Sequence, residues 1–393
     1  MANNFNLTYR IIDKLKRSDS NEKADQHSRT YLISNQNEQN EENYILRLIN
    51  LENLTNLSEF ITDISWYKQF NHFNLMSLKD CFLIDTKLNL VKPYASFGSC
   101  ADLLNSNPFG VCERLIAHIM WQTLQAIRYL QDKHILHRGI ASKNIYVCDD
   151  GRVLLDDFSH CISMISPFDG KLRKQIFDYT DKLKNQLLYL APEIIYQNAD
   201  GYNLKSDVYS LGMVACELAN GSNSYRNMTY GNLNILYAKI QGSEPILLDE
   251  TQLTDEMIEL CDSNNSSYIE EIRKRKYTKE FHSFIKSCVS TRLESRCSLD
   301  ELQSHAFFKF QKRLSRDRNS LHCDMVKLLE TYKKKRPINK EINHLEETSS
   351  RYFQVPIGSV DLGRYESNES IRTCCLDFPT TDYNEKRNLT WEF

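Results

Sequence analysis

The chain has 393 residues, of which 41% are hydrophobic and 26% are charged, as in ordinary folded globular proteins. Its net charge of −3 and pI near 6.4 exclude the strongly basic surface of nucleic-acid-binding and polybasic membrane proteins. We expect no signal peptide and no membrane span, because no apolar run approaches the roughly 20 residues that a span needs. The twelve cysteines lack metal-ligand spacing, which favours a reducing compartment.

Residues 5–95 are predicted to form a small, strand-rich unit. Short apolar runs alternate there with polar turns, a pattern typical of strands. The runs are YLIS, YILRLINL, CFLI and LNLV. A single helix is predicted near residues 55–70, between the second and the third of these runs.

Residues 96–312 are predicted to form a larger, helical unit. Residues 113–131 place apolar side chains at three- and four-residue steps, which predicts a long helix with a broad buried stripe. A second long helix is predicted over residues 206–221, where an Asn-Gly pair gives a C-terminal stop. Few apolar residues follow, so residues 313–393 are predicted to form an extended, largely irregular and flexible tail.

Five motifs follow one another between the predicted hairpins and helices of the larger unit. They are, in chain order, His137-Arg138-Gly139, Asp157-Phe158-Ser159, Ala191-Pro192-Glu193, Asp207 at the start of a helix, and Arg296. Their order and spacing resemble those of the protein kinases. The resemblance implies an α+β, bilobal protein-kinase-like fold with a β-rich N-lobe, an α-helical C-lobe and an extended C-terminal tail.

A narrower resemblance rests on four further stretches and on the last three residues. The stretches are FNHFNL, GYNLKSD, KSDVYSLGMVACELANG and SHAFFKFQKR, and the chain ends in Trp391, Glu392 and Phe393. They resemble the STE20-related adaptor pseudokinases (STRAD) of the STE20 group. The resemblance implies an allosteric adaptor and activator of a liver kinase B type serine/threonine kinase, acting in cell polarity in the cytoplasm and the nucleus.

The same resemblance implies two partner-binding regions. Residues 160–190, the activation segment, are expected to contact the partner kinase in the place of a substrate. Trp391, Glu392 and Phe393 are expected to dock on a helical-repeat scaffold of the mouse-protein-twenty-five type, completing a ternary complex. Two aromatic side chains at the end of a polar tail suit a partner's pocket.

The resemblance places Gly139 and Ala141 where active kinases have the catalytic aspartate and the loop lysine. Gly139 has no side chain to accept or orient the proton of a substrate hydroxyl, and losing a general base typically costs on the order of 10²–10⁴ in rate. We therefore predict that the chain is not an enzyme. The alternative is a low-activity serine/threonine kinase that retains Mg-ATP binding, because Asn144 and Asp157 stand at both metal-ligand positions.

The other nucleotide-binding positions are retained unevenly. Arg47 stands at the position of the small-lobe lysine and Asp63 at that of its acidic partner, so the two are predicted to form a lobe-aligning ion pair. Lys92 falls at the gatekeeper position, where a cation is unfavourable unless it is paired. No glycine occurs between residues 10 and 30, where a phosphate-binding loop belongs. The sequence therefore neither predicts nor excludes that ATP binds as a structural ligand, with or without magnesium.

An apolar stack through both lobes is expected at the motif residues. His137, Phe158 and Tyr67 are predicted to form it, with a strand residue such as Leu83 completing the stack. These residue types at these positions are structural rather than chemical.

Four other residues are predicted to support the fold. Asp207 is expected to hydrogen-bond the backbone of the catalytic loop, and Arg296 to pair with Glu193. Arg138 either meets a phosphate on the activation segment or forms a plain salt bridge, and both interpretations stay open. Asp156 is expected to point to the other strand face from its neighbour, so it is not a second metal ligand.

Overall fold

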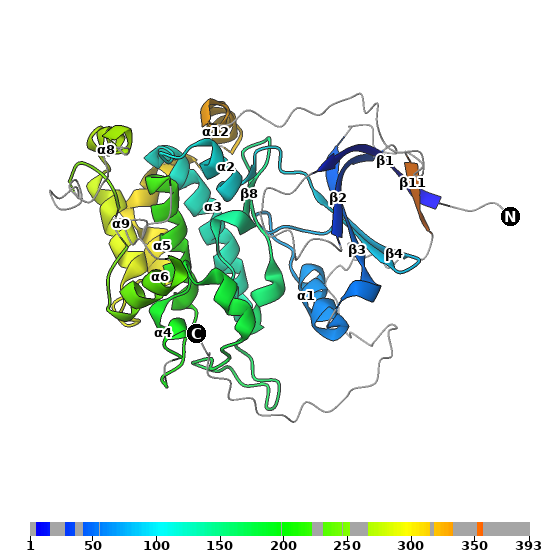
Figure 1. Cartoon of the computed structure of the whole chain (residues 1–393), viewed down its shortest axis with the longest axis horizontal. Helices are drawn as coiled ribbons and strands as arrows, with labels where there is room; N and C mark the ends of the chain where they lie inside the picture. Colours follow the sequence, from blue (N-terminus) through cyan, green and yellow to red (C-terminus); the bar gives the residue numbers. More distant parts are fainter. Residues whose placement is uncertain are drawn as a thin grey trace.

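The computed structural model describes residues 5–15, 28–35, 42–54, 56–197, 199–221, 231–245, 247–251, 266–314, 318–332 and 352–356. These residues form two lobes, one rich in strands and one helical, as Figure 1 shows. The α+β, bilobal prediction is confirmed. Within the described ranges, no helix combines the length and the apolar character that a membrane crossing would require.

A six-stranded sheet forms the N-lobe, in the order β11-β1-β2-β3-β5-β4, and all its neighbouring strands are antiparallel. The strands are β1 (Phe5–Leu15), β2 (Ser28–Asn35), β3 (Asn43–Asn50), β4 (Asp80–Ile84), β5 (Lys87–Pro93) and β11 (Tyr352–Pro356). The four predicted apolar runs lie on β2 to β5, and the predicted helix is α1 (Leu57–Gln69). Leu46 and Val91 on facing strands are buried in the small core of this lobe.

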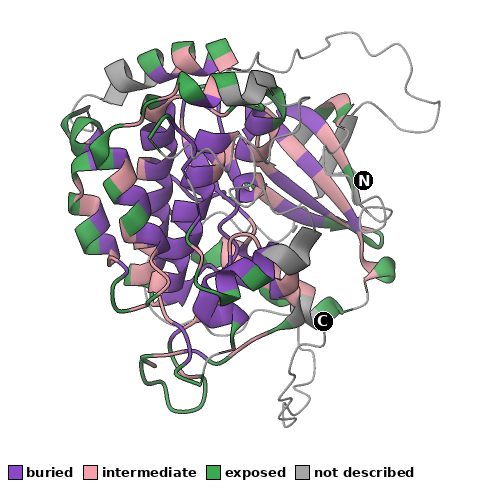
Figure 2. Cartoon of the chain, turned by 60° about the vertical axis from the view of Figure 1, so that its left-hand side comes forward, coloured by how far each residue is buried: buried purple, intermediate pink, exposed green. Residues whose placement is uncertain are grey.

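Two long helices, α3 (Glu113–Asp132) and α5 (Lys205–Asn220), form the centre of the C-lobe. Around them lie α2 (Cys100–Ser106), α4 (Pro192–Ile195), α6 (Gly231–Ile240), α8 (Ser266–Arg273), α9 (Lys279–Val289), α10 (Leu299–Ser304), α11 (Lys309–Leu314) and α12 (Arg318–Tyr332). Figure 2 shows that the buried residues concentrate in the inner helices of this lobe, while the outer helices expose one face.

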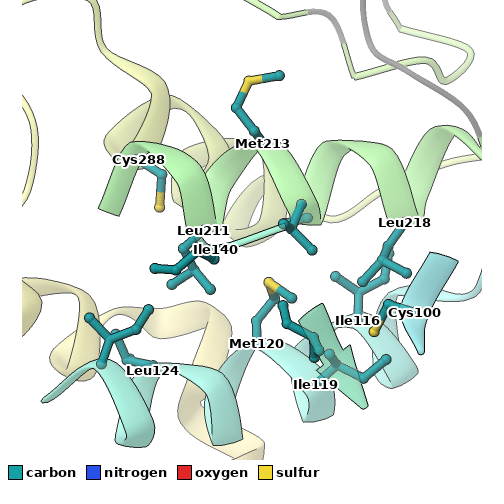
Figure 3. Close-up of a cluster of buried hydrophobic side chains, with 14 of the residues drawn as sticks. Cys100, Ile116, Ile119, Met120, Leu124, Ile140, Leu211, Met213, Leu218 and Cys288 are labelled. Atoms are coloured by element: carbon teal, nitrogen blue, oxygen red, sulfur yellow. The ribbon is translucent and has the colours of Figure 1, made fainter. Parts of the chain in front are cut away.

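The sequence explains why α3 and α5 occupy the centre. Figure 3 shows Met120 of α3 and Leu211 of α5 in one apolar cluster, with Cys100 beside Ile116 at its other end. Helix α9 packs on α5 at Gly212, where a Cβ atom would lie 2.5 Å from the Cβ of Cys288. Both long helices confirm the predicted periodicity, and α5 ends as predicted at a left-handed glycine, with φ of 78°.

Short elements at the junction of the lobes hold the kinase-like motifs. They are β6 (Gly98–Ser99), β7 (Ile135–Leu136), β8 (Ile145–Val147), β9 (Val153–Leu155) and β10 (Ile162–Ser163), with single-turn 3₁₀ helices at Ser142–Asn144 and Phe158–His160. Three other 3₁₀ helices lie elsewhere: Leu51–Asn53 after β3, Asp181–Gln186 in the activation segment and Ala306–Phe308 before α11. Strands β8 and β9 form a hairpin, and β7 pairs with β10. The two pairings bring the catalytic-loop motif and the Asp157-Phe158-Ser159 motif together.

The prediction of an irregular tail after residue 312 is wrong for two segments. Helix α12 packs on the C-lobe with Met325 and Leu329 buried, and β11 adds a strand to the N-lobe sheet. Helix α12 has apolar residues at three- and four-residue steps, Leu321, Met325, Leu328 and Tyr332, a periodicity that the prediction of an irregular tail overlooked. The remainder of the tail after residue 332, apart from β11, lies outside the described residues.

Candidate functional site

The catalytic-loop backbone is fixed by one buried carboxylate. Asp207 accepts hydrogen bonds from the backbone N–H of His137 at 2.8 Å and of Arg138 at 2.9 Å. Arg138 has a positive φ of 58°, a strained conformation that these two bonds hold in place. Burial raises the pKa of Asp207 to about 6, although both backbone donors favour its charged form. The predicted structural role of Asp207 is confirmed.

The position of the catalytic aspartate is occupied by a glycine under a histidine ring. A Cβ atom at Gly139 would lie 3.0 Å from Cδ2 of His160, so a larger residue there would press on that ring. The backbone N–H of Gly139 donates to Nδ1 of His137 at 3.1 Å, and Ala141 is fully buried. Neither Gly139 nor Ala141 brings a side chain that can exchange a proton with a bound hydroxyl.

Arg138 makes a structural ion pair rather than an open phosphate site. Its guanidinium is buried, lies 3.4 Å from the Asp178 carboxylate, and donates to the Tyr202 hydroxyl at 2.8 Å. It also donates to the carbonyl of His160 at 2.6 Å. Of the two interpretations of Arg138, the salt bridge is the one that the structure contains. It ties the catalytic loop to the activation segment.

The predicted ring stack is present, with one member replaced. The ring of Phe158 lies 4.7 Å from that of Tyr67 and 5.7 Å from that of His137, both edge to face. Leu83 does not complete the stack, because it is 52% exposed on β4. Phe70, which directly follows α1, takes its place, with its ring 4.9 Å from that of Phe158. Burial lowers the pKa of His137 to about 4, so the ring is neutral in the folded chain at pH 7.

A buried polar cluster joins three elements across the lobe boundary. Nζ of Lys92, on β5, lies 2.9 Å from Oδ2 of Asp156 and 2.7 Å from the hydroxyl oxygen of Tyr67, on α1. The Tyr67 hydroxyl in turn donates, at 2.5 Å, to Oδ1 of Asp156, the residue that directly follows β9. Burial lowers the pKa of Lys92, and the Asp156 carboxylate acts against that shift. We call these three side chains the Lys92–Tyr67–Asp156 cluster.

This cluster was missed by sequence reasoning, which set Asp156 aside. The signal was Lys92 itself, because a cation beside an apolar pocket needs an acidic partner. The sequence does not identify that partner, which lies 64 positions away.

The predicted ion pair between Arg47 and Asp63 is wrong. Asp63 instead lies 3.4 Å from Nζ of Lys182, in the activation segment, and no salt bridge joins it to Arg47 within the described part of the chain. Helix α1 is therefore tied to the activation segment through Asp63 and to β5 through Tyr67. The positive charge of Arg47 is still felt at the cluster, where it acts to lower the pKa of Lys92.

The two candidate metal ligands contact each other. Nδ2 of Asn144 donates to Oδ2 of Asp157 at 3.1 Å and to the carbonyl of Gly139 at 2.8 Å, and Ser159 donates to Oδ1 of Asp157 at 2.6 Å. Burial opposes the charge on Asp157, but His160 and the Ser159 hydroxyl hold the pKa of this carboxyl below its usual value. An ionised carboxylate beside an amide fits a hard cation such as Mg²⁺.

Comparison with known proteins agrees with this geometry. The protein kinase domain model matches residues 28–308. The STE20-related kinase adapter protein alpha of Gallus gallus is 31% identical over 266 residues, covering 63% of this chain and 67% of that protein. The chain belongs to the STE20-related kinase adapter proteins, within the protein kinase domain family.

Two further members of the adapter family show the same level of similarity. STE20-related kinase adapter protein alpha of Homo sapiens is 30% identical over 266 residues, covering 63% of this chain and 61% of that protein. STE20-related kinase adapter protein strd-1 of Caenorhabditis elegans is 32% identical over 250 residues, covering 62% of this chain and 61% of that protein. Each is named an adapter, which agrees with the pseudokinase prediction.

The predicted pair of Arg296 and Glu193 is confirmed in this adapter-family C-lobe. Two nitrogens of Arg296 donate to the two carboxylate oxygens of Glu193 at 2.6 and 2.9 Å, and both side chains are buried. Lys239, which the sequence did not single out, lies nearby and donates to the carbonyls of Leu187, Leu188 and Leu190. Together they fix the end of the activation segment on the C-lobe.

Two parts of the predicted site lie outside the described residues. They are Trp391, Glu392 and Phe393, and residues 16–27, which lie between β1 and β2 in the sequence and contain no glycine. The docking motif and the phosphate-loop prediction therefore stay predictions.

Replacing Lys92 by methionine tests the cluster. The change leaves the buried Asp156 carboxylate without its cation, so we expect the free energy of unfolding to fall by about 3–5 kcal/mol. The double variant Lys92→Met/Asp156→Asn carries no uncompensated charge and should lose less than the single variant. Arg47→Ala is the control, with a change within about 1 kcal/mol. Denaturant titration measures all three, and equal losses in the single and double variants would exclude a coupled pair.

The buried His137 gives the stability of the fold a dependence on pH. Its folded pKa of about 4 lies below the unfolded value near 6.5, so its contribution is complete above pH 6.5 and is lost as the pH falls towards 4. His137→Phe should lower this dependence by up to about 1.4 kcal/mol per pH unit in that window. Denaturant titrations at pH 7.5, 6 and 5 measure the slope. Parallel slopes for the two proteins would show that His137 does not remain neutral.

Proposed function

We propose that this chain is a catalytically inactive adaptor that activates a liver kinase B type serine/threonine kinase. It acts in the cytoplasm and nucleus, in a ternary complex with a mouse-protein-twenty-five type scaffold bound through Trp391, Glu392 and Phe393. The observation that carries the proposal is the base position, which is a glycine under the ring of His160. Buried contacts among the chain's own side chains join the two lobes.

The mechanism is conformational. The Lys92–Tyr67–Asp156 cluster and the ring stack join the two lobes, and the pair of Asp63 and Lys182 joins helix α1 to the activation segment. A partner that binds this closed arrangement more tightly than an open one is itself held in one state, which is the requirement for allosteric activation. In a passive scaffold the lobe arrangement would be irrelevant, and Lys92→Met would leave partner activation unchanged.

The activation segment supplies the contact surface in this proposal. Residues 163–173 form a tight hairpin. The backbone N–H of Ser166 donates to the carbonyl of Lys171 at 2.8 Å, and that of Arg173 donates to the carbonyl of Met164 at 2.8 Å. Phe168, at the turn of this hairpin, is 95% exposed, and Ile165 and Leu172, which pair across the hairpin, are also exposed. A cluster of exposed apolar side chains on an ordered hairpin is typical of a protein-binding surface.

Replacing Phe168 by serine tests this surface without disturbing the fold. The side chain contributes almost nothing to the core, so we expect unchanged thermal unfolding but at least a tenfold higher concentration for half-maximal activation of the partner kinase. Such a change corresponds to about 1.4 kcal/mol of binding energy. The assay is phosphorylation of a peptide by the purified partner kinase with the scaffold present. Leu83→Ser, on the exposed face of β4, is the matched control, and an equal effect of both substitutions would refute the assignment.

We further propose that ATP binds as a structural ligand and is not turned over. The ionised Asp157 beside Asn144 supports magnesium binding, and the pairing of Lys92 with Asp156 removes the objection of a lone cation in the pocket. Magnesium held there would balance phosphate charge. The absence of glycine from residues 16–27 argues against tight phosphate binding, because glycine is the residue that lets backbone N–H groups approach phosphates closely.

Thermal unfolding with and without ATP, each with and without magnesium, tests nucleotide binding. ATP at about 100 times its dissociation constant should add about 2.7 kcal/mol to the free energy of unfolding. Asp157→Asn should abolish only the part of this added stability that needs magnesium. No shift under any condition would exclude ATP, and phosphate transfer by the purified chain that is lost in Asp157→Asn would favour the low-activity kinase instead.

A further inference from the structure

Two cysteines lie at the two ends of a short loop in the C-lobe. Cys288 is in the last turn of α9, and Cys297 stands two positions before α10. The backbone N–H of Cys297 donates to the carbonyl of Ser287 at 3.1 Å. Because Cys288 directly follows that carbonyl, standard backbone dimensions place the Cα atoms of the two cysteines roughly 5–6 Å apart. This separation lies within the range of disulfide-bonded pairs.

The two side chains also meet the same part of the core. Cys288 is fully buried, and its Cβ closely approaches Gly212 of α5. Cys297 is half-buried and packs against the same apolar cluster. Burial raises the pKa of the Cys288 thiol, and the neighbouring Cys297 thiol raises it further, an effect that weakens with distance. The backbone and the side chains therefore agree that the two sulfur atoms are neighbours.

The loop between the two cysteines carries the arginine that anchors the activation segment. The carbonyl of Ser290 accepts from Nε of Arg296 at 3.1 Å and from its Nη2 at 3.0 Å. The same guanidinium pairs with the Glu193 carboxylate. The loop is thus already folded back on itself around Arg296. A covalent bond between its two ends would strengthen a closure that the backbone has made and would need little movement.

We propose that Cys288 and Cys297 form a reversible disulfide when the chain meets a peroxide, and that this bond braces Arg296 against Glu193. In a reducing compartment, the disulfides that do form are usually transient and redox-sensing. The end of the activation segment would then be held more firmly in the oxidised chain than in the reduced one. This proposal does not depend on the proposed function, because it concerns the isolated chain.

The chemistry needs only the two thiols and one molecule of hydrogen peroxide. Cys297 reacts first, because it is half-buried whereas Cys288 is fully covered. Its thiolate attacks one peroxide oxygen, the O–O bond breaks, and the released hydroxide takes the proton that the thiol gave up. The Cys288 sulfur then attacks the sulfenic acid. The S–S bond forms, the S–O bond breaks, and the leaving hydroxide takes the Cys288 proton, so two thiols and one peroxide give one disulfide and two waters.

Peptide mapping of the full-length chain after treatment with hydrogen peroxide tests the site. Trypsin cleaves between the two cysteines and places them on separate peptides, residues 287–292 and 297–309. After the remaining thiols are blocked, we expect these two peptides to appear joined, and dithiothreitol should release them. Cys297→Ser should abolish the joined species. Cys112→Ser, which changes another half-buried cysteine, is the matched control and should retain it.

Thermal unfolding of the reduced and the oxidised chain measures the bracing. A bond that closes a loop of about ten residues restricts the unfolded chain, so we expect the oxidised wild type to unfold at least about 3 °C higher. Hydrogen exchange of peptides from residues 187–196, at the end of the activation segment, should slow at least threefold. Neither quantity should respond to peroxide in Cys297→Ser.

Three results would overturn the proposal. If the joined peptide links Cys288 to Cys216 of α5, the other thiol that acts on it, the assigned pair is wrong. If Cys297 is oxidised to a sulfinic acid while Cys288 stays unmodified, the two sulfur atoms do not meet. If the disulfide forms but leaves thermal unfolding and the exchange of residues 187–196 unchanged, it does not brace the anchor.

Discussion

The alignment of the two lobes depends on an ion pair that is buried at their boundary. Lys92 comes from the sheet, Tyr67 from the helix beside it, and Asp156 from the loop that follows β9. Separating the lobes would break the three hydrogen bonds that the Asp156 carboxylate accepts from Lys92 and Tyr67. Hydrogen bonds to charged groups are the stronger kind. Keeping one of the charges without the other is far less favourable than keeping both. The lobes are thus aligned by three of the chain's own side chains.

This arrangement redistributes the contacts that align an active kinase. In active kinases, a lysine on the third strand pairs with a glutamate on the neighbouring helix. Here Arg47 occupies the strand position and Asp63 the helix position, but the two do not pair. Asp63 pairs with Lys182 in the activation segment, and the cation that joins the lobes is Lys92 on β5. An alignment made by the chain's own side chains suits a protein whose relatives are named adapters.

The sequence predicted those features that follow from a local pattern or from a known order of motifs, and it missed contacts between residues far apart in the chain. The two long helices were predicted from the spacing of their apolar residues. The ring stack around Phe158 and the pair of Arg296 and Glu193 were predicted from motifs that occur in the same order in protein kinases. Leu83 was misplaced because neighbouring strand residues face opposite sides, and its neighbour Phe82 is the buried one. Asp156 was missed because nothing local links it to Lys92. Strand β11 was missed because five residues are too few to show a period.

The pairing of β1 with β11 also bears on the order in which the chain can fold. The first strand of the chain meets its outer partner only after some 340 further residues have been made, since Thr8 pairs with Gln354. Contacts between residues so distant in sequence form slowly. During synthesis the C-lobe helices become available before that strand does, and β1 emerges with one edge open. Among the described elements, the N-lobe sheet is therefore the first to be started and the last to be completed. A ribosome-bound chain passes through a long period in which that edge is open to other strands.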